Sequence, residues 1–66
     1  MFKVTNLETD EHDYFENANY AYNYISRYAL YNDMCITYDG TSKGKDVYTL
    51  ESWHGTESAC FTIEKC

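Results

Sequence analysis

The apolar and polar positions of the chain follow two different periods. Residues 2–5 alternate between apolar and polar side chains, which predicts a short strand with Phe2 and Val4 on its buried face. Residues 18–29 carry apolar side chains at spacings of three and four, the period of a helix. This stripe consists of Ala18, Ala21, Tyr22, Ile25, Tyr28 and Ala29. The alanines of the stripe would let the helix lie close against a sheet.

The ends of the helix are marked by polar residues. Asn17 is a suitable N-cap, whereas Asp13 and Glu16 offer a capping box one turn earlier. We therefore expect the helix to begin between Asp13 and Asn17. The pair Asn32-Asp33 is expected to end it.

The second half of the chain is typical of a β-meander. Strands are predicted over residues 34–39, 46–54 and 58–65. Residues 40–45 form the first loop, with Gly40 and Gly44 as turn residues. Gly55-Thr56 has the glycine-first signature of a two-residue hairpin turn.

The second turn fixes a register. With Gly55-Thr56 as the loop, Leu50 pairs with Phe61 and Tyr48 pairs with Ile63. All four side chains then share the face that covers the helix. The opposite face is mostly polar, so a slip of one residue would mix the two faces.

The first hairpin has two possible registers. A plain six-residue loop places Ile36 and Tyr38 on the outer face, whereas a one-residue bulge at Gly40 or Gly44 brings them inside. We favour the bulge, because Met34, Ile36 and Tyr38 then give the helix a better apolar surface.

These elements predict a single α+β domain over residues 1–66. Its expected order is β-α-β-β-β, with one helix packed on an antiparallel sheet of three or four strands. A chain of 66 residues buries only about 60% of the surface that its unfolded form exposes. A deep substrate pocket would consume much of such a core, so we expect a binding protein and not an enzyme.

The net charge of −6 changes the expected partners. Five basic residues are scattered along the chain, which disfavours direct contact with nucleic acid or with an anionic membrane. A protein with a basic surface is the favoured partner.

One acidic stretch, residues 7–16, lies just before the predicted helix. Its carboxylates belong to Glu8, Asp10, Glu11, Asp13 and Glu16. This stretch is either a solvated surface that keeps the protein soluble or an array that imitates the phosphates of a nucleic acid.

Eight tyrosines are more than the core pattern requires. Tyr20, Tyr24 and Tyr31 lie on the flank of the helix at spacings of four and seven, with Arg27 among them. Tyrosine is enriched at interfaces, so these residues predict a protein-binding strip. The alternative is that they only cover the edges of the sheet.

The cysteines and histidines form no recognisable site. Cys35, Cys60, Cys66, His12 and His54 lack the spacing of zinc ligands. In a meander, Cys35 and Cys60 lie two strands apart, roughly 9–10 Å, which is too far for a disulfide. We expect no metal, no cofactor and no catalytic pair. No secretory signal is visible either, so we expect a cytoplasmic protein with reduced thiols.

The segment Tyr14-Phe-Glu-Asn-Ala-Asn-Tyr-Ala-Tyr-Asn-Tyr-Ile25 resembles a common arrangement in small bacteriophage accessory proteins. In these proteins a strand end, a polar cap and an alanine-containing helix precede a β-meander. Anti-CRISPR and anti-restriction inhibitors of this kind are short, acidic and rich in aromatic residues. The resemblance is one of style and carries over no individual residue. It implies an inhibitor of a host enzyme, acting in the host cytoplasm.

The sequence therefore predicts a phage-type inhibitor that blocks a basic, nucleic-acid-handling host protein. Its expected contact residues are the five carboxylates of the acidic stretch together with Tyr20, Tyr24 and Tyr31. One alternative is a module that self-associates, as a homodimer, through a strand edge and the tyrosines. Another is a small metal or redox protein that uses the cysteines.

Overall fold

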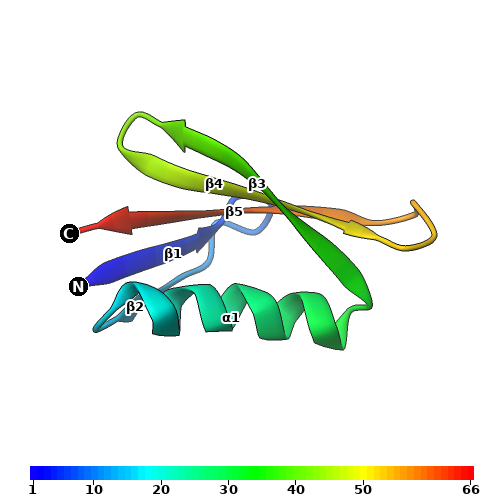
Figure 1. Ribbon diagram of the computed structural model, residues 1–66, viewed down its shortest axis with the longest axis horizontal. Coiled ribbons are helices and arrows are strands. Elements are labelled where there is room, and N and C mark those ends of the chain that lie inside the picture. The colour runs from blue at the N-terminus through cyan, green and yellow to red at the C-terminus, as the bar shows by residue number, and fades with distance from the viewer.

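The computed structural model describes residues 1–66 and contains one helix on one face of a five-stranded antiparallel sheet (Figure 1). The strands run in the spatial order β2-β1-β5-β4-β3. In chain order the elements are β1 (Phe2–Asn6), β2 (His12–Phe15), α1 (Ala18–Tyr31), β3 (Met34–Ser42), β4 (Lys45–Ser52) and β5 (Ser58–Lys65). The predicted α+β class is confirmed, but the sheet has five strands instead of three or four.

The additional strand, β2, lies inside the acidic stretch. It pairs with β1 and forms one edge of the sheet, with Phe15 opposite Phe2 and Asp13 opposite Val4. Phe15 is its only side chain that is even half-buried. Because an exposed edge strand needs no alternating apolar residues, the sequence pattern gave no sign of it.

Helix α1 begins and ends where the polar residues indicate. Asn17 is the N-cap, and its Oδ1 accepts a hydrogen bond from the Tyr20 backbone N–H at 2.9 Å. At the other end the Asn32 backbone N–H donates to the Tyr28 carbonyl oxygen at 3.1 Å. The capping box of Asp13 and Glu16 is not used, because residue 13 belongs to β2.

The core lies between α1 and the sheet. Its buried apolar side chains are Val4, Ala21, Ile25, Ala29, Met34, Leu50, Ala59, Phe61 and Ile63. The face predicted for Leu50, Phe61 and Ile63 is therefore confirmed, with Tyr48 half-buried beside them. The predicted helix stripe is confirmed at Ala21, Ile25 and Ala29, which are buried, and Tyr28 is half-buried. It is wrong at two positions, since Ala18 is exposed and the Tyr22 side chain is 40% exposed.

The β4–β5 hairpin differs from the prediction in its turn. Strand β4 ends at Ser52, so five residues, 53–57, form the loop in place of Gly55-Thr56 alone. The Ser52 Oγ accepts hydrogen bonds from the backbone N–H groups of Thr56 and Glu57, at 3.0 and 3.2 Å, which supports the wider loop. Tyr48 pairs with Phe61 as a result. The register moves by two residues, and each side chain therefore stays on its predicted face.

The β3–β4 hairpin contains the bulge that we favoured. Its register shifts between Tyr38 and Gly40, so that Met34, Ile36 and Tyr38 share the helix-side face. Tyr38 is on this face but 55% exposed, because it lies beyond the end of the core. The predicted six-residue loop is shorter: β3 continues to Ser42, and only residues 43–44 turn, both with positive φ.

The two ends of the chain meet in the middle of the sheet. Strand β1 pairs with β5 from Phe2 to Asn6, and the Cys66 backbone N–H donates to the Met1 carbonyl oxygen at 2.9 Å. Both termini therefore lie side by side, at the same end of these two inner strands, on the left in Figure 1.

Candidate functional site

A groove of about 330 Å³ runs between α1 and the edge strand β2. It is lined by Phe15, Tyr20, Asn23, Tyr24 and Arg27. We call these five residues the aromatic groove. Strand β2 supplies Phe15 and helix α1 supplies the other four, because residues three and four apart share one side of a helix. Two of the three predicted tyrosines therefore lie in the same hollow.

The groove is anchored to the core by its aromatic rings. The Tyr24 ring centroid lies 5.5 Å from that of Phe15 and 6.4 Å from that of the buried Phe61. Despite these contacts the Tyr24 side chain is 37% exposed, and that of Tyr20 is 56% exposed. Because the Tyr24 ring already packs against two other rings, it should lose little conformational freedom when it binds a partner.

Negative charge from the acidic stretch reaches this groove. Asp13 pairs with the buried Val4, so its side chain lies on the same side of the sheet as α1. Burial raises the pKa of the Tyr24 hydroxyl, and the nearby charges of Asp13 and Glu11 raise this pKa further. Carboxylates and aromatic rings therefore lie next to each other here.

The remaining predicted contact residues lie outside the groove. Glu8 and Asp10 belong to the turn between β1 and β2, and Glu16 lies in the link to α1. Cys60 lies on the face of the sheet away from α1. Burial raises the pKa of its thiol, and the charges of Asp39 and Glu8 raise this pKa further. Tyr31 is 82% exposed in the last turn of α1, on the same flank as Tyr20 but beyond the groove.

Two residues of the groove were missed by sequence reasoning. Asn23 lies three residues after Tyr20, so helical spacing alone would have found it. Phe15 had no such signal, because it lines the groove only through the unrecognised strand β2.

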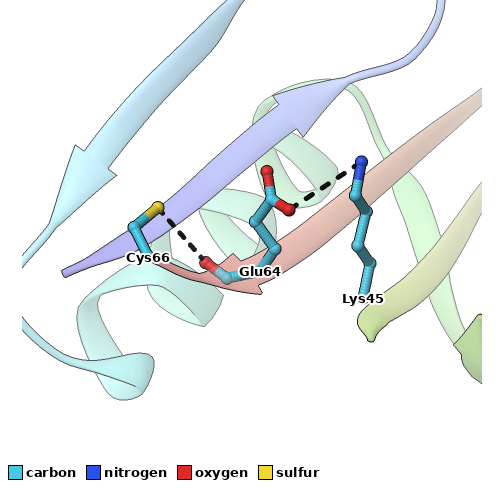
Figure 2. A network of polar contacts seen from close by, with 3 residues as sticks. All are labelled: Lys45, Glu64 and Cys66. Atoms are coloured by element: carbon cyan, nitrogen blue, oxygen red, sulfur yellow. Dashed lines mark hydrogen bonds and ion pairs between the residues drawn. The ribbon is translucent and has the colours of Figure 1, made fainter. Parts of the chain in front are cut away.

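The face of the sheet opposite α1 carries mixed charge. Lys3, Glu64 and Lys45 lie in one row across β1, β5 and β4. Figure 2 shows the ion pair in this row, with the Lys45 Nζ 3.9 Å from the Glu64 Oε2, and the Cys66 thiol donating to the Glu64 carbonyl oxygen. We call this side the open face; its positive charges partly offset its negative ones, unlike the acidic stretch.

The cysteines remain separate thiols. Cys35 lies on β3 and Cys60 on β5, with β4 between them as the meander predicted, and Cys66 is exposed. No group of three or more histidine, cysteine, aspartate or glutamate side chains lies close enough to hold a metal ion. The three thiols therefore form no common centre.

Comparison with protein-family models, curated proteins and solved structures finds no match to this chain. No helix in the structure has the length and apolar character that crossing a membrane requires.

Proposed function

We propose that this protein binds a second protein through the aromatic groove and the neighbouring carboxylates of Glu11 and Asp13. The observation that carries this proposal is the position of these charges beside Tyr24, an exposed ring that packs against Phe15 and the buried Phe61. Interfaces favour aromatic anchors, and complementary charge increases the rate and specificity of association.

The net charge of −6 supports a partner with a basic surface. Proteins that handle nucleic acids carry such surfaces, because they must neutralise phosphates. By occupying that surface, this protein would act as an inhibitor, as its resemblance in style to small phage inhibitors implies. The carboxylates would stand in for phosphates, and the tyrosines would add affinity that does not depend on charge.

The test is affinity capture from a bacterial lysate at low salt, followed by a high-salt wash. We expect release of a nucleic-acid-binding protein, and we expect added nucleic acid to compete for it. Tyr20→Ala should weaken capture, since truncation of an interface tyrosine costs about 1 kcal/mol or more. Glu51→Gln is the control, because it removes one exposed charge from the open face without touching the groove. Capture that nucleic acid and Tyr20→Ala both leave unchanged would refute the proposal.

One observation favours self-association as a second candidate. Strand β3 forms the other edge of the sheet, and its nine residues have no partner strand on their outer side. Two copies can pair such edges in antiparallel fashion. Sedimentation over a range of concentrations would show a dimer, and Thr37→Lys on this edge would disfavour it. A monomer at every concentration would exclude this candidate.

A further inference from the structure

The β3–β4 hairpin bends away from α1 (Figure 1). A second hollow lies between this hairpin and the flank of α1 opposite the aromatic groove. Its volume is about 370 Å³, and it shares no lining residue with the aromatic groove. We call it the hairpin cleft. The residues that matter for its chemistry are Phe2, Tyr22, Asp46, Tyr48, Ile63 and Lys65. A hollow of this volume, lined by apolar side chains and a few charged ones, is typical of a small-molecule site.

One side of the hairpin cleft holds an oriented carboxylate. The Asp46 Oδ1 accepts hydrogen bonds from the Tyr38 hydroxyl at 3.1 Å and from the Thr41 hydroxyl at 3.0 Å. The second oxygen, Oδ2, has no partner within the protein. Because two hydroxyls fix the carboxylate, Oδ2 is a preorganised acceptor for the N–H groups of a cation.

The other side holds a positive charge. Asp46 pairs with Ile63, and Lys65 follows two residues later on the same face of β5. Such diagonal neighbours are roughly 7–8 Å apart between backbones. The Lys65 ammonium makes no ion pair, since Lys45 and Glu64 form the only one in the protein. Two opposite, unpaired charges therefore border one hollow, with space between them.

The lining of the hairpin cleft is mixed, and its apolar part is formed mainly by four side chains: Phe2, Tyr22, Tyr48 and Ile63. The Tyr22 and Tyr48 rings lie 5.6 Å apart and are tilted by 58°, while Ile63 is buried and Phe2 is half-buried. Burial raises the pKa of the Tyr48 hydroxyl, and the charge of Asp46 raises it further. The Asp46 carboxylate therefore lies beside half-buried and exposed aromatic rings at the mouth of the hairpin cleft.

We propose that the hairpin cleft binds a small zwitterion with an apolar body, which is the chemistry of a free hydrophobic α-amino acid. The ligand's ammonium group donates to the Asp46 Oδ2, and its carboxylate pairs with Lys65. Its side chain packs against Phe2 and Tyr22. A simple cation would leave Lys65 unpaired, and a simple anion would leave Asp46 unpaired. This site is independent of the proposed protein-binding surface.

The test compares three probes on the unmodified protein by amide NMR titration at millimolar concentration. The probes are L-phenylalanine, its amide, which lacks the carboxylate, and its N-acetyl derivative, which lacks the ammonium group. We expect L-phenylalanine to shift the signals of Gly44 and Asp46. Each of the other two should bind roughly tenfold more weakly, the loss of one charge-assisted hydrogen bond. No shift in the hairpin cleft, or equal binding of all three, would overturn the proposal.

Two variants assign the two charges. Asp46→Asn should remove the preference for L-phenylalanine over the N-acetyl derivative, and Lys65→Gln should remove its preference over the amide. Glu51→Gln, on the open face, should bind all three probes as the unmodified protein does. If either variant retains both preferences, the assignment of that charge is wrong. Because the probe comparison needs no substitution, the proposal remains testable even if Asp46→Asn impairs folding.

Discussion

At the level of single residues, burial and negative charge act in the same direction on Tyr24, Tyr48 and Cys60. Burial raises the pKa of each, and nearby carboxylates add to the effect in every case. Asp13 and Glu11 act on Tyr24, while Asp46 acts on Tyr48. The excess of carboxylates in the chain therefore changes the pKa of individual hydroxyl and thiol groups.

The raised tyrosine pKa values predict a loss of stability in alkali. In the unfolded chain a tyrosine ionises near pH 10, whereas the folded protein holds these two protons to higher pH. Their stabilising effect is therefore complete below about pH 10 and is lost as the pH rises through the folded values. Urea unfolding followed from pH 8 to pH 12 should show this decline. The double variant Tyr24→Phe and Tyr48→Phe should show a shallower one, and an equal slope would contradict the prediction.

Cys60 is expected to react slowly with alkylating reagents. The thiolate is the nucleophile, and burial together with the charges of Asp39 and Glu8 raises the pKa of this thiol. At pH 8, iodoacetamide should therefore modify the exposed Cys66 before Cys60, as peptide mass spectrometry would measure. Asp39→Asn should speed the reaction of Cys60, while Glu57→Gln should leave it unchanged. Equal rates at Cys60 and Cys66 would disprove the expected order.

At the level of elements, α1 depends on its cap as well as on its buried face. Only three of its side chains are fully buried: Ala21, Ile25 and Ala29. Two of these are alanines, which contribute little apolar area. The Asn17 side chain satisfies one of the backbone N–H groups that the first turn would otherwise leave free.

Asn17→Ala should therefore destabilise the protein by about 1 kcal/mol, the usual cost of a lost N-cap. The midpoint of urea unfolding would measure this change. Asn17→Ser should retain most of the stability, because serine also caps helices. Asn19→Ala, at an exposed position two residues further along the chain, is the matched control. A midpoint for Asn17→Ala equal to that of the control would mean that the cap contributes nothing.

The elements also show why the sequence predicted some features and not others. The period of α1 and the alternation of β5 arise from burial, so both elements were predicted closely. The loop at 53–57 depends on the Ser52 side chain, which a search for glycine turns does not consider. Strand β2 is held by backbone pairing to β1 at an exposed edge, which leaves no trace in hydrophobicity.

The candidate site follows the same division. Tyr20 and Tyr24 were predicted because helical spacing places them on one flank of α1. The groove between them and Phe15 was not predicted, because its second wall is β2. The hairpin cleft was missed as well, since it forms where β1 and the start of α1 meet the β4–β5 pair, and no periodicity in the sequence predicts that arrangement.

At the level of the whole molecule, like charges dominate. The chain contains eleven acidic and five basic residues, and only one ion pair forms between them. Repulsion among unpaired carboxylates opposes the compact state, and salt screens that repulsion over a distance of about 10 Å at 0.1 M. Salt is therefore expected to stabilise the isolated protein while weakening its complex with a basic partner.

The thermal midpoint should accordingly rise when sodium chloride is added to a low-salt solution. Scanning calorimetry would measure the rise. The double variant Glu11→Gln and Asp13→Asn, which removes two charges from the acidic stretch, should show a smaller dependence on salt. A midpoint that falls or stays constant in sodium chloride would show that attractive pairs, and not repulsion, control the stability of the fold.

The meeting of the two chain ends has a consequence for biosynthesis. Strand β5 supplies Phe61 and Ile63 to the core and separates β1 from β4, yet it is the last of the six elements to leave the ribosome. Until it emerges, β1–β2 and β3–β4 are hairpins that have no strand to join them. The nascent domain therefore cannot complete its core step by step, and folding must wait until residue 65 has cleared the exit tunnel.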